Sequence, residues 1–300
     1  MFKDRDIVCF VGDSITANGL WMAEVYQELR KKYKIKCYNC GVSGGAAQKV
    51  AGYLHSECLI FNPDHVVLML GMNDLDRNLY SAENLAREDL NEKRNAKVQS
   101  FRENYEKIVR ECVASGAEVT LCLPTPYDEV SDYETERLFY QQALEKEAAY
   151  QTELAEKYSC SIVNFKDNML PLLGKMNVIR EDRVHPTEKG YHIMAQIFLK
   201  ETGEIDECDF DAPFVFEEWN RMRYEAEMYN HKLNFVELCA TFENGYAMQK
   251  STEEIKQIAK EMLDAYEGPS LFIPEAYREY IKRGHLRAQN KGEIVRLTIF

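Results

Sequence analysis

Long hydrophobic runs are missing from this sequence. No stretch of its 300 residues approaches the roughly 18 consecutive apolar residues that a membrane-spanning helix needs. The short apolar run from Ile7 to Val11 lies between charged residues and a polar Gly-Asp-Ser turn, which is unlike a secretory leader. We therefore expect a cytoplasmic protein without a membrane segment.

An excess of positive charge is also missing. Acidic residues outnumber basic ones 50 to 37, which leaves a net charge of −13. Proteins that bind nucleic acids gain most of their affinity from Lys and Arg side chains that face phosphates. The charge balance therefore argues against a nucleic acid or an anionic membrane as a partner.

The cysteines lack the spacing of a metal site. There are nine of them, an odd number, and none forms a CxxC pair or a cluster with histidine at ligand spacing. We expect reduced, buried thiols, and no metal or cofactor. The cysteines in apolar contexts are Cys9, Cys37, Cys40, Cys122, Cys160 and Cys239.

Short apolar segments alternate with helical patterns over the first two thirds of the chain. Hydrophobic residues make up 45% and charged residues 29% of the sequence, as in globular proteins. The alternation predicts βαβ units, and hence an α/β fold with a parallel sheet covered by helices on both faces. The expected strands are Ile7–Val11, Lys34–Asn39, His65–Leu70, Ala117–Leu123 and Ser161–Phe165, and the expected helices span about 20–33, 50–61, 81–115, 135–158 and 187–201.

The alternation stops near Gly203, which predicts a domain over 1–202 and a mainly helical C-terminal extension over 203–300. The extension is expected to cap the site or to form a contact between copies of the chain in a homo-oligomer. Its expected helices are Glu217–Asn230, Thr252–Tyr266 and Glu275–Arg283, followed by a strand at Glu293–Phe300.

Special residues follow three of the expected strands. Ser14 comes after the first strand, Gly44 after the second and Asn73 after the third, while Asp182 and His185 precede the last helix. The carboxyl ends of parallel strands meet at one edge of a sheet, where open α/β sheets bind their ligands. We therefore expect these five residues to converge.

Their chemistry suits a nucleophilic serine. A serine hydroxyl needs a base, and histidine is the side chain whose pKa suits that task near neutral pH. Asp182 lies three residues before His185, close enough for a turn to fold its carboxylate onto the imidazole. The backbone N–H groups of Ser14 and Gly44 and the amide of Asn73 are candidate donors to an oxyanion.

Four blocks of the sequence contain these residues, namely Gly12-Asp13-Ser14, Asn39-Cys40-Gly41-Val42-Ser43-Gly44, Gly71-Met72-Asn73-Asp74 and Asp182-Arg183-Val184-His185-Pro186. In this order they resemble the SGNH (GDSL-like) hydrolase family, over about residues 5–201. The resemblance implies a flavodoxin-like three-layer α/β/α fold around a five-stranded parallel sheet. It also implies ester or acyl hydrolysis by Ser14, His185 and Asp182, with oxyanion donors at Ser14, Gly44 and Asn73.

Two carboxylates stand beside the expected catalytic groups. We expect Asp13 and Asp74 to support the site by accepting backbone hydrogen bonds that hold their loops. They also suggest a metal-dependent phosphoesterase, but the sequence lacks further His and Asp ligands at metal spacing.

The predicted function is ester hydrolysis through an acyl-enzyme. A short-acyl ester, such as an acetyl group on a small soluble molecule or a carbohydrate, is the expected substrate, because no basic amphipathic helix could hold a lipid surface. The alternative is a catalytically silent binding or scaffold protein that uses the C-terminal extension. The complete set of triad and oxyanion residues argues against that alternative.

Overall fold

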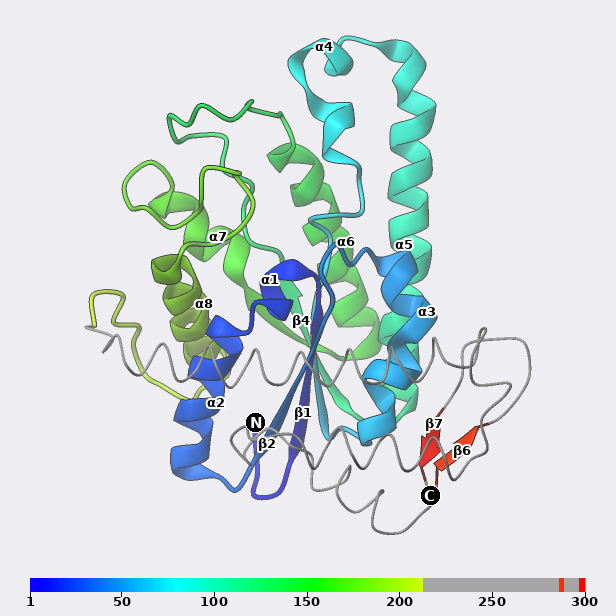
Figure 1. Cartoon of the computed structure of the whole chain (residues 1–300), viewed down its shortest axis with the longest axis vertical. Coiled ribbons are helices and arrows are strands. Elements are labelled where there is room, and N and C mark those ends of the chain that lie inside the picture. Colours follow the sequence, from blue (N-terminus) through cyan, green and yellow to red (C-terminus); the bar gives the residue numbers. More distant parts are fainter. Residues whose placement is uncertain (213–285, 289–296, 300) are drawn as a thin grey trace.

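The predicted five-stranded parallel sheet is confirmed. The computed structural model describes residues 1–212, 286–288 and 297–299. Its main sheet has the strand order β2-β1-β3-β4-β5, with every neighbouring pair parallel (Figure 1). The strands are β1 (Ile7–Gly12), β2 (Lys36–Gly41), β3 (His65–Met69), β4 (Glu118–Leu123) and β5 (Ser161–Asn164).

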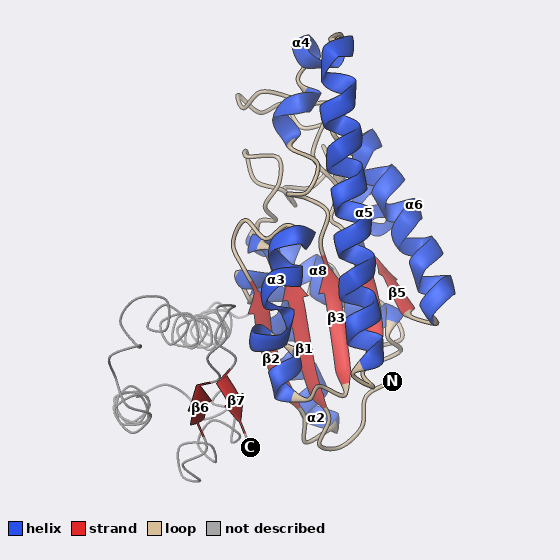
Figure 2. Ribbon diagram, turned by 90° about the vertical axis from the view of Figure 1, so that its right-hand side faces the viewer, coloured by secondary structure: helices blue, strands red, loops and turns tan. Residues whose placement is uncertain are grey.

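Helices cover both faces of the sheet, which gives three layers (Figure 1). Helix α2 packs against α8 on one face, and α5 packs against both α3 and α6 on the other. Beyond the carboxyl ends of the strands, α4 and the first turns of α5 project away from the sheet (Figure 2). The helices are α1 (Ser14–Ala17), α2 (Leu20–Lys32), α3 (Ala47–Glu57), α4 (Ala82–Leu85), α5 (Asn91–Ala114), α6 (Gln141–Tyr158), α7 (Phe165–Met169) and α8 (Glu188–Glu201).

Burial of the central strands explains their unbroken apolar sequences. Every residue of β3 is buried, and so is every residue of β1 after Ile7. Strands covered on both faces have no solvent side to favour polar residues. Aromatic rings join the sheet to one helical layer, since Trp21 of α2 lies 5.1 Å from Phe10 of β1 and 5.6 Å from Phe198 of α8, measured between ring centroids.

Two of the predicted helices differ from the structure. The region 81–115 is not one helix, because α4 ends at Leu85 and α5 begins only at Asn91. Arg94 of α5 donates hydrogen bonds to the carbonyls of Leu79 and Asn84, which holds the intervening chain in a folded-back path.

The helix predicted over 135–158 begins at Gln141. The backbone groups before it form hydrogen bonds to distant residues and not to each other. Phe139 N donates to Tyr80 O at 2.8 Å, and the Thr135 carbonyl accepts from Arg183 Nε at 2.9 Å. Residues 135–140 are therefore a loop, and the prediction of a helix there was wrong. The backbone groups that a helix would use are bound to distant residues instead.

Most of the predicted C-terminal extension lies outside the described residues, including its three expected helices. Strands β6 (Leu286–Ala288) and β7 (Leu297–Ile299) pair antiparallel, so the strand predicted at 293–300 is described only over β7. The domain boundary at 202 stays a prediction. The chain just after that boundary contacts the sheet domain, since the Asp209 carbonyl lies 3.1 Å from His192 Nε2 of α8.

Within the described ranges, no helix is both long enough and apolar enough to cross a bilayer.

Gly41 provides a test of how β2 supports the loop after β1. A Cβ on Gly41 would lie 2.4 Å from the backbone nitrogen of Ala17 in α1, whereas a Cβ on Gly52 in α3 would meet nothing within 4 Å. We expect Gly41→Ala to lower the free energy of unfolding by about 1–3 kcal/mol, as overpacking does. Gly52→Ala is the matched control and should raise it by up to about 1 kcal/mol, since alanine favours helix. Urea denaturation measures both, and equal stability of the two variants would contradict the close approach of α1 to β2.

Candidate active site

Ser14 lies at the carboxyl end of β1, where the chain turns into α1. The Asp13 side chain caps this helix by accepting a hydrogen bond from Ile15 N at 2.9 Å. Ser14 is the first residue of α1, so its own N–H has no acceptor within the helix. The hydroxyl and the N–H of Ser14 therefore belong to the same tight turn, and the side chain is only partly buried.

Ser14, His185 and Asp182 form one hydrogen-bonded chain. Ser14 Oγ lies 2.8 Å from His185 Nε2, and His185 Nδ1 lies 2.6 Å from Asp182 Oδ2. Because an ionised carboxylate can only accept, Nδ1 carries the proton and Nε2 is left to accept from the serine hydroxyl. This is the tautomer in which an imidazole can take a proton from serine.

The turn from Asp182 to His185 aligns the imidazole with the carboxylate. Asp182 Oδ1 accepts the backbone N–H groups of Val184 at 2.9 Å and His185 at 2.8 Å, while Oδ2 faces the ring. Partial burial acts to raise the pKa of Asp182, but these two N–H groups and the imidazole together hold it below its usual value. The carboxylate is therefore ionised at neutral pH and able to stabilise a positive charge on His185.

Gly44 and Asn73 belong to the loops that follow β2 and β3. Gly44 has a backbone φ of +67°, a conformation that favours glycine, and a Cβ there would meet nothing within 4 Å. Asn73 Nδ2 donates to Gly45 O at 3.2 Å and to Asp13 Oδ2 at 3.3 Å, which connects the turn after β2 to the turn after β1. Arg77 Nη1 donates to Asn73 Oδ1 at 3.3 Å and so fixes which way the amide points.

The two supporting carboxylates are buried and partly compensated. Asp74 Oδ1 accepts the backbone N–H of Ala47 at 2.6 Å, at the first turn of α3. Burial raises the pKa of Asp74 to about 7, although the hydrogen bond from Ala47 opposes the shift. Burial likewise raises the pKa of Asp13 to about 6, against the hydrogen bond from Ile15 and the electrostatic interactions with His185 and Arg77.

The structure brings Ser14, His185 and Asp182 into direct contact, and it places Asn73 in contact with the turn that contains Gly44. Sequence reasoning missed two residues that hold this arrangement. Arg77 lies four residues after Asn73 and resembles any other loop arginine in the sequence. Arg183 lies inside the motif that includes His185, yet its burial depends on a loop more than forty positions away.

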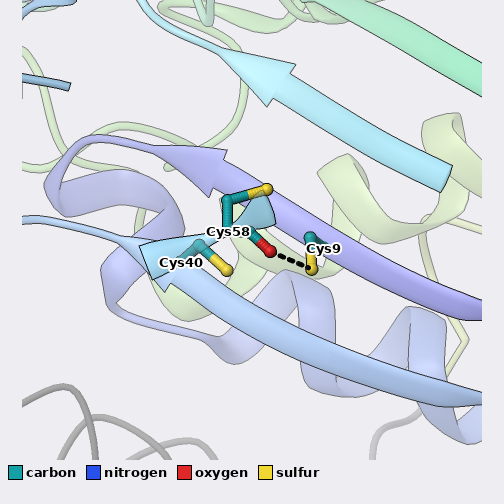
Figure 3. A group of neighbouring side chains, drawn as sticks. All are labelled: Cys9, Cys40 and Cys58. Carbon is teal, nitrogen blue, oxygen red and sulfur yellow. Dashed lines mark hydrogen bonds between the residues drawn. The ribbon is translucent and has the colours of Figure 1, made fainter. Parts of the chain in front are cut away.

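Three cysteines that are distant in the sequence meet in the core. The Sγ atoms of Cys9 in β1, Cys40 in β2 and Cys58 after α3 lie within 4.8 Å of one another (Figure 3). Their spacing gave no signal, because only the pairing of β1 with β2 brings the first two together. Burial raises the pKa of the Cys9 thiol well above its usual value. Because a metal ion needs thiolates and this site favours neutral thiols, we interpret the three cysteines as part of the core.

Burial of Asp74 implies a pH-dependent loss of stability. Its pKa is about 7 in the folded protein and close to 4 in a solvated chain, so the folded state binds this proton more tightly. Stability is then lost as pH rises between these two values, and Asp74→Asn, which keeps the acceptor for Ala47 N, removes that loss. We expect the stability of the variant relative to wild type to grow by a few kcal/mol between pH 4 and pH 7.

Denaturation with urea across this pH range measures the difference, and the exposed Asp132→Asn controls for the loss of one negative charge. If the difference in the free energy of unfolding between Asp74→Asn and wild type stayed constant with pH, folding would not raise the pKa of Asp74.

Comparison with known proteins places the chain in a family. The family model for GDSL-like lipase/acylhydrolase matches residues 8–198. No curated protein matches the chain. Among solved structures, BT4096, a gut microbial diltiazem-metabolizing enzyme, aligns with a TM-score of 0.61 and 22% identity over 68% of this chain. The alignment covers 48% of BT4096, so this chain spans about half of that protein's length.

A second fold match is Axe2, an acetylxylan esterase from Geobacillus stearothermophilus. It aligns with a TM-score of 0.56 and 19% identity, over 67% of this chain and 95% of Axe2. A catalytic mutant of Axe2 aligns with a TM-score of 0.57 and 19% identity, over 69% of this chain and 99% of the mutant. At these identities the matches establish the fold, a parallel sheet in the order 2-1-3-4-5 between two helical layers.

The family model covers most of the chain and includes all four motif blocks, from the turn at Ser14 to the turn at His185. The chain therefore belongs to the GDSL-like lipase/acylhydrolase family, a family of ester hydrolases.

Proposed function

We propose that this protein hydrolyses esters through an acyl-enzyme on Ser14, with His185 as general base and Asp182 as its partner. The observation that carries the proposal is the continuous hydrogen-bonded chain from Ser14 Oγ through His185 to Asp182, with distances of 2.8 and 2.6 Å. A serine with no catalytic role has no need of an oriented imidazole and a carboxylate of lowered pKa.

Ester hydrolysis at this triad takes two steps, acylation of Ser14 and hydrolysis of the acyl-enzyme. As Ser14 Oγ attacks the ester carbonyl carbon, its proton moves to His185 Nε2, and the resulting imidazolium is stabilised by Asp182. His185 then gives the proton to the leaving alkoxide, which departs as an alcohol and leaves the acyl group on Ser14. A water molecule then attacks the acyl carbon and gives a proton to His185 Nε2. As the bond from the acyl carbon to Ser14 Oγ breaks, His185 returns the proton to Oγ and the carboxylic acid is released.

The oxyanion of each tetrahedral intermediate needs hydrogen-bond donors. Ser14 N–H has no acceptor in α1, and no acceptor for Gly44 N–H is found among the described residues. Asn73 Nδ2 has two long hydrogen bonds, at 3.2 and 3.3 Å, and these can yield to a stronger acceptor such as an oxyanion. We assign these three groups as the oxyanion hole.

We assign the substrate to the class of short-acyl esters, with an acetyl group on a small soluble molecule or a carbohydrate. The His185 and Asp182 side chains are 34% and 49% exposed, which leaves the side where the alcohol departs open to a hydrophilic group. Axe2, which shares the fold, is an acetylxylan esterase, and we extend its acyl class to this chain as part of the proposal.

Hydrolysis of p-nitrophenyl acetate, butyrate and octanoate tests the reaction and the acyl preference together. We expect activity that is resistant to EDTA and highest on the acetate. Ser14→Ala should lower kcat by up to about 10⁶, as loss of a triad nucleophile does. Activity that survived in Ser14→Ala, or that EDTA abolished, would contradict the serine mechanism. A preference for octanoate would contradict only the short-acyl assignment.

Asn73 can be tested separately from the nucleophile. Asn73→Ala should lower kcat by about 10²–10³, as loss of one oxyanion donor does, with a smaller change in KM. The exposed Asn78, five positions further on, provides Asn78→Ala as a control that should keep wild-type activity. If the two variants had the same kcat, Asn73 would not be an oxyanion donor.

A further inference from the structure

Arg183 has an unusual backbone conformation at the centre of the triad turn. Its φ is +66°, a left-handed value that residues with a Cβ rarely adopt. It lies directly between Asp182 and the residues that lead to His185, so its backbone decides whether the carboxylate can reach the imidazole. The structure therefore keeps backbone strain at the point where the triad geometry is set.

The Arg183 side chain is buried although it carries a charge, with only 2% of the residue exposed. Its guanidinium donates to four backbone carbonyls of a single loop, residues 128–135, and to no carboxylate of the part of the chain that the structure describes. Nε donates to Thr135 O at 2.9 Å and Nη2 to Tyr133 O at 3.0 Å, while Nη1 donates to the carbonyls of Asp128 and Ser131, both at 3.0 Å. Four carbonyls can converge on one guanidinium only while the loop keeps this shape.

The loop is bound to the same turn by two further contacts. Asp128 N donates to the carbonyl of Arg183 at 3.0 Å, and Tyr133 Oη donates to Ile179 O at 2.6 Å. The Asp128 carboxylate, which is itself buried, accepts from Val130 N and from both the N–H and the hydroxyl of Ser131. Loop 128–135 is thus internally braced, and it is bound to the chain at Arg183 and at Ile179, four residues earlier.

We propose that Arg183 is a positioning residue, whose anchorage in loop 128–135 holds the strained turn that joins Asp182 to His185. The proposal rests on the catalytic roles proposed above for these two residues. The guanidinium holds the backbone in its left-handed conformation against relaxation. Without the anchor, an L-residue at this position relaxes toward negative φ, and the carboxylate moves out of line with His185 Nδ1.

Variants at position 183 can separate a loss of triad alignment from a loss of stability. Arg183→Ala and Arg183→Lys keep a Cβ and lose the fork of hydrogen bonds, so both should relax. Arg183→Gly loses the same anchor, but glycine adopts a left-handed φ without strain. Glycine should therefore keep the triad aligned even though it loses the same contacts to the loop.

The experiment compares the three variants with wild type and with Arg137→Lys, an exposed arginine near the same loop. The readouts are kcat and KM on p-nitrophenyl acetate, the thermal midpoint, and the low-field proton NMR signal of the His185 Nδ1–H group. We expect Arg183→Ala and Arg183→Lys to lose kcat by at least about tenfold, with little change in KM, since small misplacements of catalytic groups are costly. Both should also lose the low-field signal.

Arg183→Gly should have a thermal midpoint as low as that of Arg183→Ala but keep the signal and a kcat within about threefold of wild type. Equal impairment of the glycine and alanine variants, or wild-type kcat and signal in Arg183→Lys, would overturn the proposal. Should Arg183→Ala not fold, the comparison of the lysine with the glycine variant decides it. If the wild type does not hydrolyse esters, the proposed function fails. The Nδ1–H signal, compared between wild type and each variant, still tests the positioning role of Arg183.

Discussion

The parallel pairing of β1 with both β2 and β3 is the constraint on which the rest of the site depends. Its register aligns Gly12 with Gly41 on one side and with Met69 on the other, so three strands end at one level. The loops that follow them must then share a small space at the edge of the sheet. Glycines allow this, because a side chain on Gly41 would collide with α1.

The electrostatic environment at this edge differs between the triad carboxylate and the two supporting carboxylates. On the triad side, Asp182 is half exposed, accepts three hydrogen bonds and is ionised at neutral pH. Asp13 and Asp74, by contrast, are buried, and their pKa values are raised by that burial. Hydrogen bonds thus favour the charged form of Asp182 beside the imidazole, whereas burial opposes the charged forms of Asp13 and Asp74.

Much of the fold and most of the site could be predicted from the sequence. Buried parallel strands such as β3 have largely apolar sequences, and polar residues after such strands must meet at one edge, which is why Ser14 and Asn73 could be predicted to lie close together. His185 was predicted from its spacing to Asp182 and from the motif that contains both. The structure also depends on contacts between distant residues that no local pattern encodes. Arg183 looks like a solvated loop residue, the loop over 135–140 is not helical because its backbone binds elsewhere, and Cys9, Cys40 and Cys58 meet only through strand pairing.

The central claim is that Ser14 is an activated nucleophile, and covalent labelling tests it without knowledge of the natural substrate. A fluorophosphonate probe needs only a serine with a working base, so we would treat wild type, Ser14→Ala and His185→Ala and map the adduct by peptide mass spectrometry. The account predicts one adduct, on Ser14 of the wild type, with no label in Ser14→Ala and strongly slowed labelling in His185→Ala. An unlabelled wild type, or an adduct on another serine, would contradict it and favour a silent binding protein built on this fold.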